Sequence, residues 1–327
     1  MRKLAAALLV FSVACTSDDP DLTDTDATGT SDDSGDGDPG DGDGDPGDGD
    51  GEPGDGDGEP EPPPVPTELP SVNGPCPDFV TGDVEFAPAG TETRTVKLWV
   101  GDQPQPLEQP GGMLVIYWHA FGSQPAEAAY TLSQVVIDAI TAAGGVVAAP
   151  YPGSEVGQFP WYYVNGDDRD DDMLLADEIV ACAIAEVGVD PRRIHATGMS
   201  AGGLQTTAMA MRRSRYVASV TTFSGGVLAA LDFEDPSNHF AAMILHGGAN
   251  DVFGGVVQFD QLSTQWFNQL RGNGNFAFMC DHGMGHNIPA GFGPDVANFF
   301  YAHPFGTEPS PYAAGLPTEL PDYCALP

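Results

Sequence analysis

After residue 70 the chain is a succession of short, nearly continuous apolar runs separated by longer stretches with helical periodicity. The runs span residues 95–100, 113–118, 145–149, 193–197, 217–223, 242–245 and 275–279. The helical stretches span residues 125–143, 171–187, 202–213 and 257–271. Strands that are apolar on both faces are typical of a parallel sheet covered by helices on each side. The alternation therefore predicts an α/β fold with a doubly wound, mostly parallel sheet and helices on both faces.

The first seventy residues have a different composition. Residues 16–70 are dominated by Asp, Gly, Glu and Pro, and they carry too few large apolar side chains to offset the entropy lost on folding. We predict an export signal at residues 1–15, a disordered acidic linker at 16–70 and one folded domain at 71–327. The Gly-Asp repeats at 35–58 lack the flanking helices and the bidentate Glu of a calcium loop, which favours a charged spacer over a calcium site.

The N-terminus has the pattern of an export signal. Arg2 and Lys3 precede an apolar run at 4–13 that is too short to span a membrane. The segment Ser12-Val13-Ala14-Cys15 resembles the lipobox of bacterial lipoproteins, with a serine where leucine is usual. The resemblance implies an exported envelope protein attached to the membrane only through a lipid on Cys15. Plain secretion after a nearby cleavage is the alternative.

The charge of the chain restricts its partners. The net charge is −37, and 28 of the 48 acidic residues lie in the predicted folded domain against 9 basic ones. No stripe of Lys and Arg is present, which argues against nucleic-acid binding. Because an acidic body repels anions, a neutral substrate is favoured.

Four cysteines follow the predicted signal. Cys76, Cys182, Cys280 and Cys324 form an even set in a chain expected to reach an oxidising compartment, so two disulfides are expected. Three pairings are possible. The alternative is that Cys182 and Cys280 are buried free thiols.

A glycine-flanked serine follows the run at 193–197. The segment Gly198-Met199-Ser200-Ala201-Gly202 lies between a predicted strand and a predicted helix, the setting of a nucleophile elbow. Such a tight turn strains the serine backbone and exposes its hydroxyl, and its flanking residues must be small. A chance match is the alternative, but the setting favours Ser200 as a nucleophile.

A serine nucleophile needs a base to accept its proton and an acidic residue to orient that base. Asp251 follows the run at 242–245, and we predict it as the acid. His286 follows the run at 275–279, and we predict it as the general base. The order Ser, acid, His is the order expected in this kind of fold.

Three other histidines were candidates for different roles. His282 is the alternative base, although the glycines at 283 and 285 favour projection of His286. His246 is expected to serve a turn or packing, and His195, inside a strand, to be a core residue.

The tetrahedral intermediate of acyl transfer needs preorganised donors for its oxyanion. We expect the backbone amide of Ala201 to be one donor. The second is expected from the loop after the run at 113–118, which reads His119-Ala120-Phe121-Gly122. Phe121 is the predicted donor and Ala120 the alternative.

With these residues in place, the region 95–289 resembles the poly(3-hydroxybutyrate) depolymerase and feruloyl esterase-like group of α/β-hydrolases. The segments that carry the likeness are Val189-Asp190-Pro191-Arg192-Arg193-Ile194 before the elbow, Asp171-Asp172, His246-Gly247 before Asp251, and Gly285-His286 followed by Pro289. The resemblance implies an α/β-hydrolase fold and an ester hydrolase. Its substrates would be polyesters, feruloylated or acetylated polysaccharides, or small esters.

Aromatic and acidic residues of the segment 159–172 raise two further hypotheses. The candidates for substrate binding are Phe159, Trp161, Tyr162 and Tyr163, and core packing is the alternative. Gln124, Phe253 and Trp266 are weaker candidates. The acids at 167, 168 and 170–172 suit a helix N-terminus better than a metal site, so no metal is expected.

These observations lead to one main hypothesis and two alternatives. The main hypothesis is hydrolysis of a neutral carboxylic ester, polymeric or oligomeric, through an acyl-Ser200 intermediate without any cofactor. The alternatives are a serine peptidase and a catalytically idle, exported binding protein. A monomer is favoured.

Overall fold

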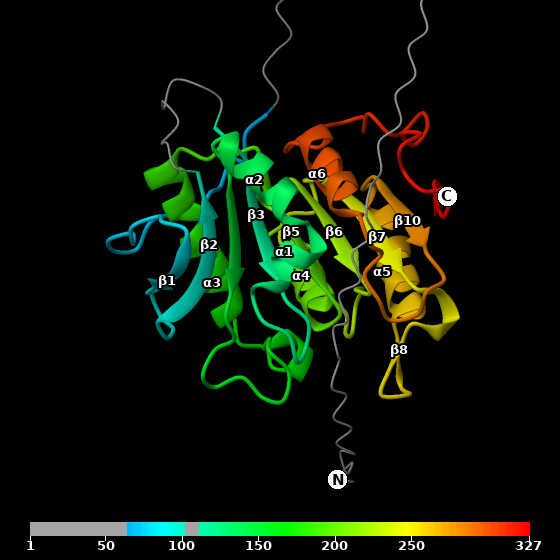
Figure 1. The fold of residues 1–327 in the computed structure, drawn as a ribbon, viewed down its shortest axis with the longest axis horizontal. Coiled ribbons are helices and arrows are strands. Elements are labelled where there is room, and N and C mark those ends of the chain that lie inside the picture. Colours follow the sequence, from blue (N-terminus) through cyan, green and yellow to red (C-terminus); the bar gives the residue numbers. More distant parts are fainter. Residues whose placement is uncertain (1–63, 102–110) are drawn as a thin grey trace, which may run out of the picture. The chain divides into compact units, whose positions relative to one another are not determined.

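The computed structural model describes residues 64–101 and 111–327. Cys15, the predicted signal and most of the predicted linker lie outside these residues. The described residues contain a nine-stranded sheet with the order β1-β2-β4-β3-β5-β6-β7-β10-β11 (Figure 1). The strands are β1 (Gly82–Phe86), β2 (Arg94–Val100), β3 (Leu114–Trp118), β4 (Val146–Pro150), β5 (Ile194–Met199), β6 (Ser219–Phe223), β7 (Ala241–His246), β10 (Ala277–Asp281) and β11 (Cys324–Ala325).

The centre of the sheet is parallel. The strands β4, β3, β5, β6, β7 and β10 pair in parallel, whereas β1, β2 and β11 are antiparallel additions at the two edges. Every residue of β3 through β7 is buried, as expected for strands covered on both faces. All seven predicted runs form strands of this sheet.

Helices cover both faces of the sheet (Figure 1). One layer packs on the side of Leu114 and Ile116 and consists of α3 (Asp171–Cys182), α4 (Ala201–Arg212) and α5 (Phe259–Asn273). The other packs on the side of Val115 and Tyr117 and consists of α1 (Glu127–Thr131), α2 (Gln134–Ala142) and α6 (Gly293–Ala302). The predicted doubly wound architecture is therefore confirmed.

The helical stretch predicted at 125–143 is interrupted. Ser133 has a φ of 68°, and its hydroxyl accepts a hydrogen bond from the Val136 amide at 3.4 Å. Because a serine at this position caps a new helix, α2 starts there instead of continuing α1. The stretch predicted at 171–187 ends in a π-helical turn at Ala183–Val187.

Two disulfides are present, and the alternative of buried free thiols is wrong. Cys76 pairs with Cys182 at the end of α3, and Cys280 of β10 pairs with Cys324 of β11. Disulfides of this kind persist in oxidising compartments.

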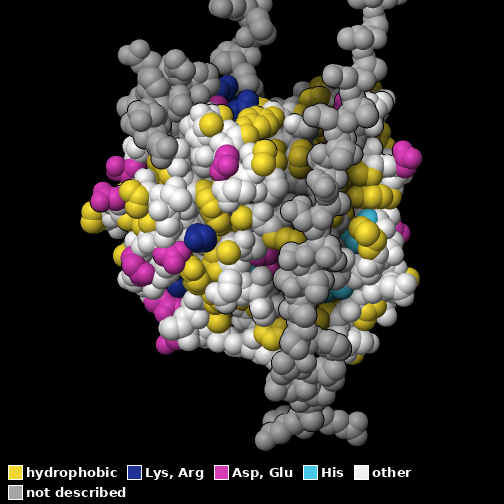
Figure 2. All heavy atoms as spheres, in the orientation of Figure 1, with side chains coloured by type: hydrophobic (Ala, Val, Ile, Leu, Met, Phe, Trp, Pro, Cys, Tyr) yellow, Lys and Arg dark blue, Asp and Glu magenta, His cyan; other side chains and the backbone are white. Residues whose placement is uncertain are grey.

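Within the described residues no helix is both long and apolar enough to span a bilayer. On the face seen in Figure 2, most acidic side chains lie toward the left edge, and Lys and Arg side chains are few.

Candidate active site

Ser200 lies at the tight turn between β5 and α4. Its φ of 57° and ψ of −118° are unusual for a residue with a side chain, and its amide donates to the Phe223 carbonyl at 2.9 Å. A Cβ on Gly202 would lie 1.8 Å from the carbonyl oxygen of Trp118 on β3. Only glycine permits this close approach, which explains the small residue expected after the serine.

The structure brings Ser200, His286 and Asp251 together in one chain of hydrogen bonds. His286 Nε2 lies 2.9 Å from Ser200 Oγ, and His286 Nδ1 lies 2.7 Å from Asp251 Oδ1. An ionised carboxylate can only accept, so Nδ1 carries the hydrogen and Nε2 is free to accept from the serine hydroxyl. The arrangement can therefore withdraw a proton from Ser200.

Asp251 is fully buried and held as a carboxylate. Its Oδ2 accepts hydrogen bonds from the Gly247 amide and the Ser224 hydroxyl, both at 2.8 Å. Burial raises the pKa of Asp251, but the hydrogen bonds from His286, Gly247 and Ser224 outweigh burial and bring the pKa below its ordinary value. Ser224 was not among the residues predicted for the site. It is the first residue after the run at 217–223, and this position at the end of a strand could have indicated it.

Phe259 orients the imidazole from another direction. Its ring stacks on that of His286, with centroids 4.6 Å apart and planes inclined by 18°. The Phe259 amide also donates to the Asp251 carbonyl at 2.9 Å. The first residue of α5 thus contacts both His286 and Asp251.

The other histidines lie elsewhere. His282 Nδ1 accepts from the Met284 amide at 3.3 Å, and burial lowers the pKa of His282. His246 Nδ1 accepts from the Gly248 amide in a turn. His195 is fully buried in β5, where Nδ1 lies 2.9 Å from Ser219 Oγ and the ring stacks on Phe300. None of these three histidines is hydrogen-bonded to Ser200, whereas His286 is.

The two residues considered for the second oxyanion donor differ in their hydrogen bonds. The Ala120 amide donates to Glu127 Oε1 at 2.9 Å, so it is not free for a ligand. The Phe121 amide has no acceptor among the described residues. Ala201 is the first residue of α4, so its amide has no acceptor within the helix.

A cavity of about 90 Å³ opens beside Ser200 and Ala201. Its walls are apolar, and they include Leu204 of α4 and Phe259 of α5. Phe121, Phe159 and Phe253 also line it. Phe159 is one of the aromatic residues predicted to bind substrate, and Phe253 is one of the weaker candidates; both line the cavity.

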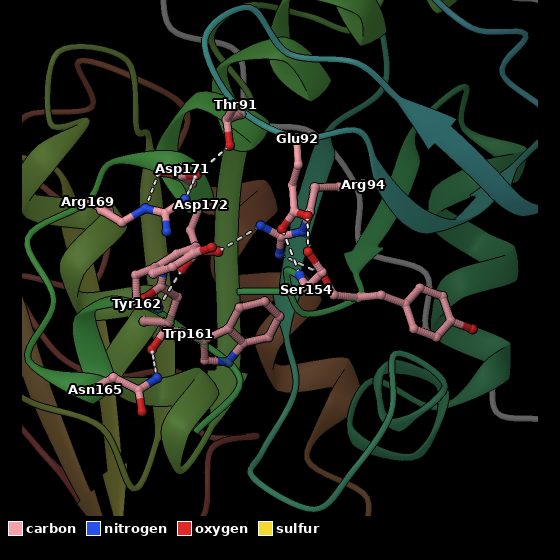
Figure 3. Close-up of polar contacts among 12 residues, drawn as sticks. Thr91, Glu92, Arg94, Ser154, Trp161, Tyr162, Asn165, Arg169, Asp171 and Asp172 are labelled. Atoms are coloured by element: carbon pink, nitrogen blue, oxygen red, sulfur yellow. Dashed lines mark hydrogen bonds and ion pairs between the residues drawn. The ribbon is translucent and has the colours of Figure 1, made fainter. Parts of the chain in front are cut away.

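Trp161 and Tyr162 are core residues, which corrects their expected role in substrate binding (Figure 3). Trp161 is fully buried, and its Nε1 donates to the His119 carbonyl at 3.0 Å. The Tyr162 amide donates to Asp172 Oδ2 at 2.9 Å, and its side chain is 1% exposed. These hydrogen bonds hold both residues in the interior of the fold.

Two other pocket candidates lie away from the cavity. Gln124 is exposed on the loop before α1, and Trp266 is a buried residue of α5. Neither lines the cavity at Ser200.

The acidic residues at the start of α3 join segments of the fold. Asp171 accepts from Thr91 and Arg169, and buried Asp172 accepts from Arg94 at 3.2 Å (Figure 3). Gln205 of α4 also donates to Asp172. The carboxylate of Asp172 therefore ties β2, α4 and the loop before α3 together.

The parallel sheet with helices on both faces and the serine at the strand-to-helix turn define the α/β-hydrolase fold. Solved structures with this fold include a pOPH variant in complex with DMSO, with a TM-score of 0.59, 16% identity and coverage of 77% of this chain and 95% of that one. Native sOPH matches with a TM-score of 0.58 and 16% identity over 79% of this chain and 96% of that one. A Bacillus cereus carboxylesterase matches with a TM-score of 0.48 and 14% identity over 64% and 93%.

The similarity to the first two structures supports the fold. No protein-family model matches the chain, and no curated protein has significant sequence similarity to it.

Proposed function

We propose that the protein is a serine carboxylic ester hydrolase that works through an acyl-Ser200 intermediate. The observation that carries the proposal is the chain of hydrogen bonds from Ser200 through His286 to buried Asp251, beside an apolar cavity. Nucleophile, base and orienting acid in this geometry are the elements of acyl transfer.

In the first half-reaction, His286 Nε2 accepts the proton of Ser200 as Oγ bonds to the ester carbonyl carbon. The carbonyl oxygen becomes an oxyanion, which the amides of Ala201 and Phe121 stabilise by hydrogen bonds. His286 then gives its proton to the leaving alkoxide, the carbon–oxygen bond breaks, and an alcohol departs. Asp251 stabilises the imidazolium between these transfers.

In the second half-reaction, water replaces the alcohol. His286 accepts a proton from the water as its oxygen bonds to the acyl carbon, and the Ser200 ester bond breaks as Oγ regains the proton. The products are free serine and a carboxylic acid. No cofactor enters either half-reaction.

The substrate in this proposal is a neutral ester, polymeric or oligomeric. An acidic protein and an uncharged cavity both favour neutral acyl groups. Polyhydroxyalkanoates and acetyl or feruloyl polysaccharide esters are the classes suggested by the sequence resemblance. The two disulfides support action in an oxidising compartment. Tethering through Cys15 remains a prediction.

Replacement of the nucleophile tests the proposal. Ser200→Ala is expected to abolish hydrolysis of p-nitrophenyl butyrate, and the wild-type protein is expected to be labelled by a fluorophosphonate at Ser200. Full residual activity in the variant would rule out the mechanism. An unlabelled, inactive wild-type protein would favour a binding role, and faster cleavage of peptides than of esters would favour a peptidase.

A further inference from the structure

Three phenylalanine rings meet at the cavity beside Ser200. Phe121 follows β3, Phe159 follows β4, and Phe253 belongs to the short strand β8 (Val252–Phe253). The ring centroids of Phe121 and Phe159 are 5.2 Å apart, those of Phe121 and Phe253 are 6.1 Å apart, and those of Phe159 and Phe253 are 6.3 Å apart. Each pair meets edge to face, an arrangement that stabilises aromatic contacts.

The three rings lie at the mouth of the cavity. Phe121 is 43% exposed and Phe253 is 36% exposed, although both also line the cavity. Leu204, 3% exposed, is the most buried large apolar side chain of the wall after Phe259, and no Asp, Glu, Lys or Arg lines the cavity. A group that enters therefore gains apolar contacts and finds no partner for a charge.

The cavity is on the acyl side of the reaction centre. The leaving oxygen must receive its proton from His286 Nε2, so the alcohol part lies next to His286. Ser200 and Ala201 line the cavity, whereas His286 does not. The acyl group, which stays bonded to Ser200 Oγ after the alcohol departs, is the part of the substrate that this cavity can hold.

The size of the cavity limits that acyl group. Its volume of about 90 Å³ is well below the roughly 150 Å³ of an engineered apolar cavity that binds benzene. An aromatic acyl group or a long alkyl chain is larger than this space, so part of it would have to extend past the rings. A short aliphatic chain does fit.

We infer that Phe121, Phe159 and Phe253 close the acyl site and select short aliphatic acyl groups over long-chain and aromatic ones. This inference rests on the proposed function. Of the ester classes considered above, this selects acetyl-sized or butyryl-sized acyl groups and disfavours feruloyl esters. Phe159 is the best position to test, because the amide of Phe121 is assigned to the oxyanion and Phe253 lies near His286, with ring centroids 6.5 Å apart.

The test is a chain-length profile. The kcat/KM of the wild-type protein is measured for p-nitrophenyl acetate, butyrate and octanoate and for methyl ferulate, and then for Phe159→Ala and Phe159→Leu. We expect the wild-type protein to prefer butyrate over octanoate by about tenfold or more, and Phe159→Ala to raise the octanoate-to-butyrate ratio by about tenfold. Val256→Ala is the matched control, because Val256 lies beside Phe253 in the chain, is 76% exposed and does not line the cavity.

A second measurement does not depend on turnover. The rate at which fluorophosphonates with ethyl and octyl chains label Ser200 reports access to the acyl site, and it should show the same preference and the same shift in both Phe159 variants. Equal wild-type rates for butyrate and octanoate, rapid cleavage of methyl ferulate, or unchanged ratios in well-folded Phe159 variants would overturn the inference. Complete absence of ester cleavage and of labelling would instead defeat the proposed function, and with it the inference.

Discussion

The amide of Gly285 donates a hydrogen bond to the carbonyl oxygen of Gly247 at 3.0 Å. This bond joins the loop that carries Asp251 to the loop that carries His286. A Cβ on Gly247 would lie 1.8 Å from the carbonyl oxygen of Gly285, so any side chain at this position must push the two loops apart.

We therefore expect Gly247→Ala to impair the candidate active site. Separation of the loops lengthens the contact between His286 and Asp251, and kcat for p-nitrophenyl butyrate should fall by about 100-fold or more, since misorientation by 1 Å has effects of this order. Gly272→Ala is the control, because a Cβ there meets nothing within 4 Å and the residue lies in α5. Near wild-type kcat in Gly247→Ala would contradict the importance of this contact.

Glu127 is expected to position the oxyanion loop. Its Oε1 accepts hydrogen bonds from the Ala120 amide and the Tyr117 hydroxyl, both at 2.9 Å. Glu127→Ala frees the loop, so kcat should fall by about tenfold while KM changes little, because the lost contact acts mainly on the transition state. Glu127→Gln keeps an acceptor oxygen and should recover most of kcat. Equal losses in both variants, or a change confined to KM, would argue against this role.

The disulfides are expected to contribute unequally to stability. Cys76 and Cys182 are 106 residues apart, and Cys280 and Cys324 are 44 apart. On the chain-entropy model the first restrains the unfolded chain more, so its removal should cost about 5 kcal/mol against about 4 kcal/mol for the second. Urea unfolding of Cys76→Ser/Cys182→Ser and Cys280→Ser/Cys324→Ser under identical conditions measures both. A larger loss of unfolding free energy in Cys280→Ser/Cys324→Ser would show that the native contacts of β11 contribute more to stability than the difference in loop length.

Acid should destabilise the fold through a buried histidine. Burial lowers the pKa of His303 to about 4, although a hydrogen bond to the Phe299 carbonyl opposes the shift. Between about pH 6.5 and pH 4 the unfolded chain then binds more protons than the native one, so stability is lost as the pH falls through this window. The loss should reach about 2 kcal/mol between pH 7.5 and pH 5.

Urea unfolding at these two pH values checks this prediction. His303→Gln should remove this contribution and leave the part due to His119, His195 and His282, whose pKa values are also lowered by burial. An identical pH dependence in the variant and the wild-type protein would assign the effect to other groups.

The central sheet was predictable because its strands are apolar on both faces. The edge strand β1 was not, because only Val84 and Phe86 of its five residues are buried and the run is too short and too polar to stand out. The helix α6 was missed for another reason. It begins with Gly293 and Pro294, which also occur in loops, and its burial depends on packing against the sheet.

The hydrogen-bonded trio was predictable because Ser200 directly follows a strand, Asp251 and His286 lie in the loops that follow two later strands, and the chain order is restrictive. Aromatic residues in loops were not, since the direction of a loop side chain depends on distant partners. Trp161 and Phe159 are two residues apart, yet one is fully buried and the other lines the cavity. The backbone of this loop is held by the side chains of Asn165 and Asp172, and neither contact has a local signature in the sequence. The cysteine pairing likewise depends on which strand and helix ends meet.

Phe121 and Phe159 belong to the loops that follow β3 and β4, whereas Ser200, Asp251 and His286 lie in the segments that follow β5, β7 and β10. Evolution can therefore alter substrate preference one loop at a time without rebuilding the reaction centre. Position 121 illustrates this separation. Its proposed contribution to the chemistry is a backbone amide, which every residue except proline has. Its side chain can therefore change with the substrate while the oxyanion donor is kept.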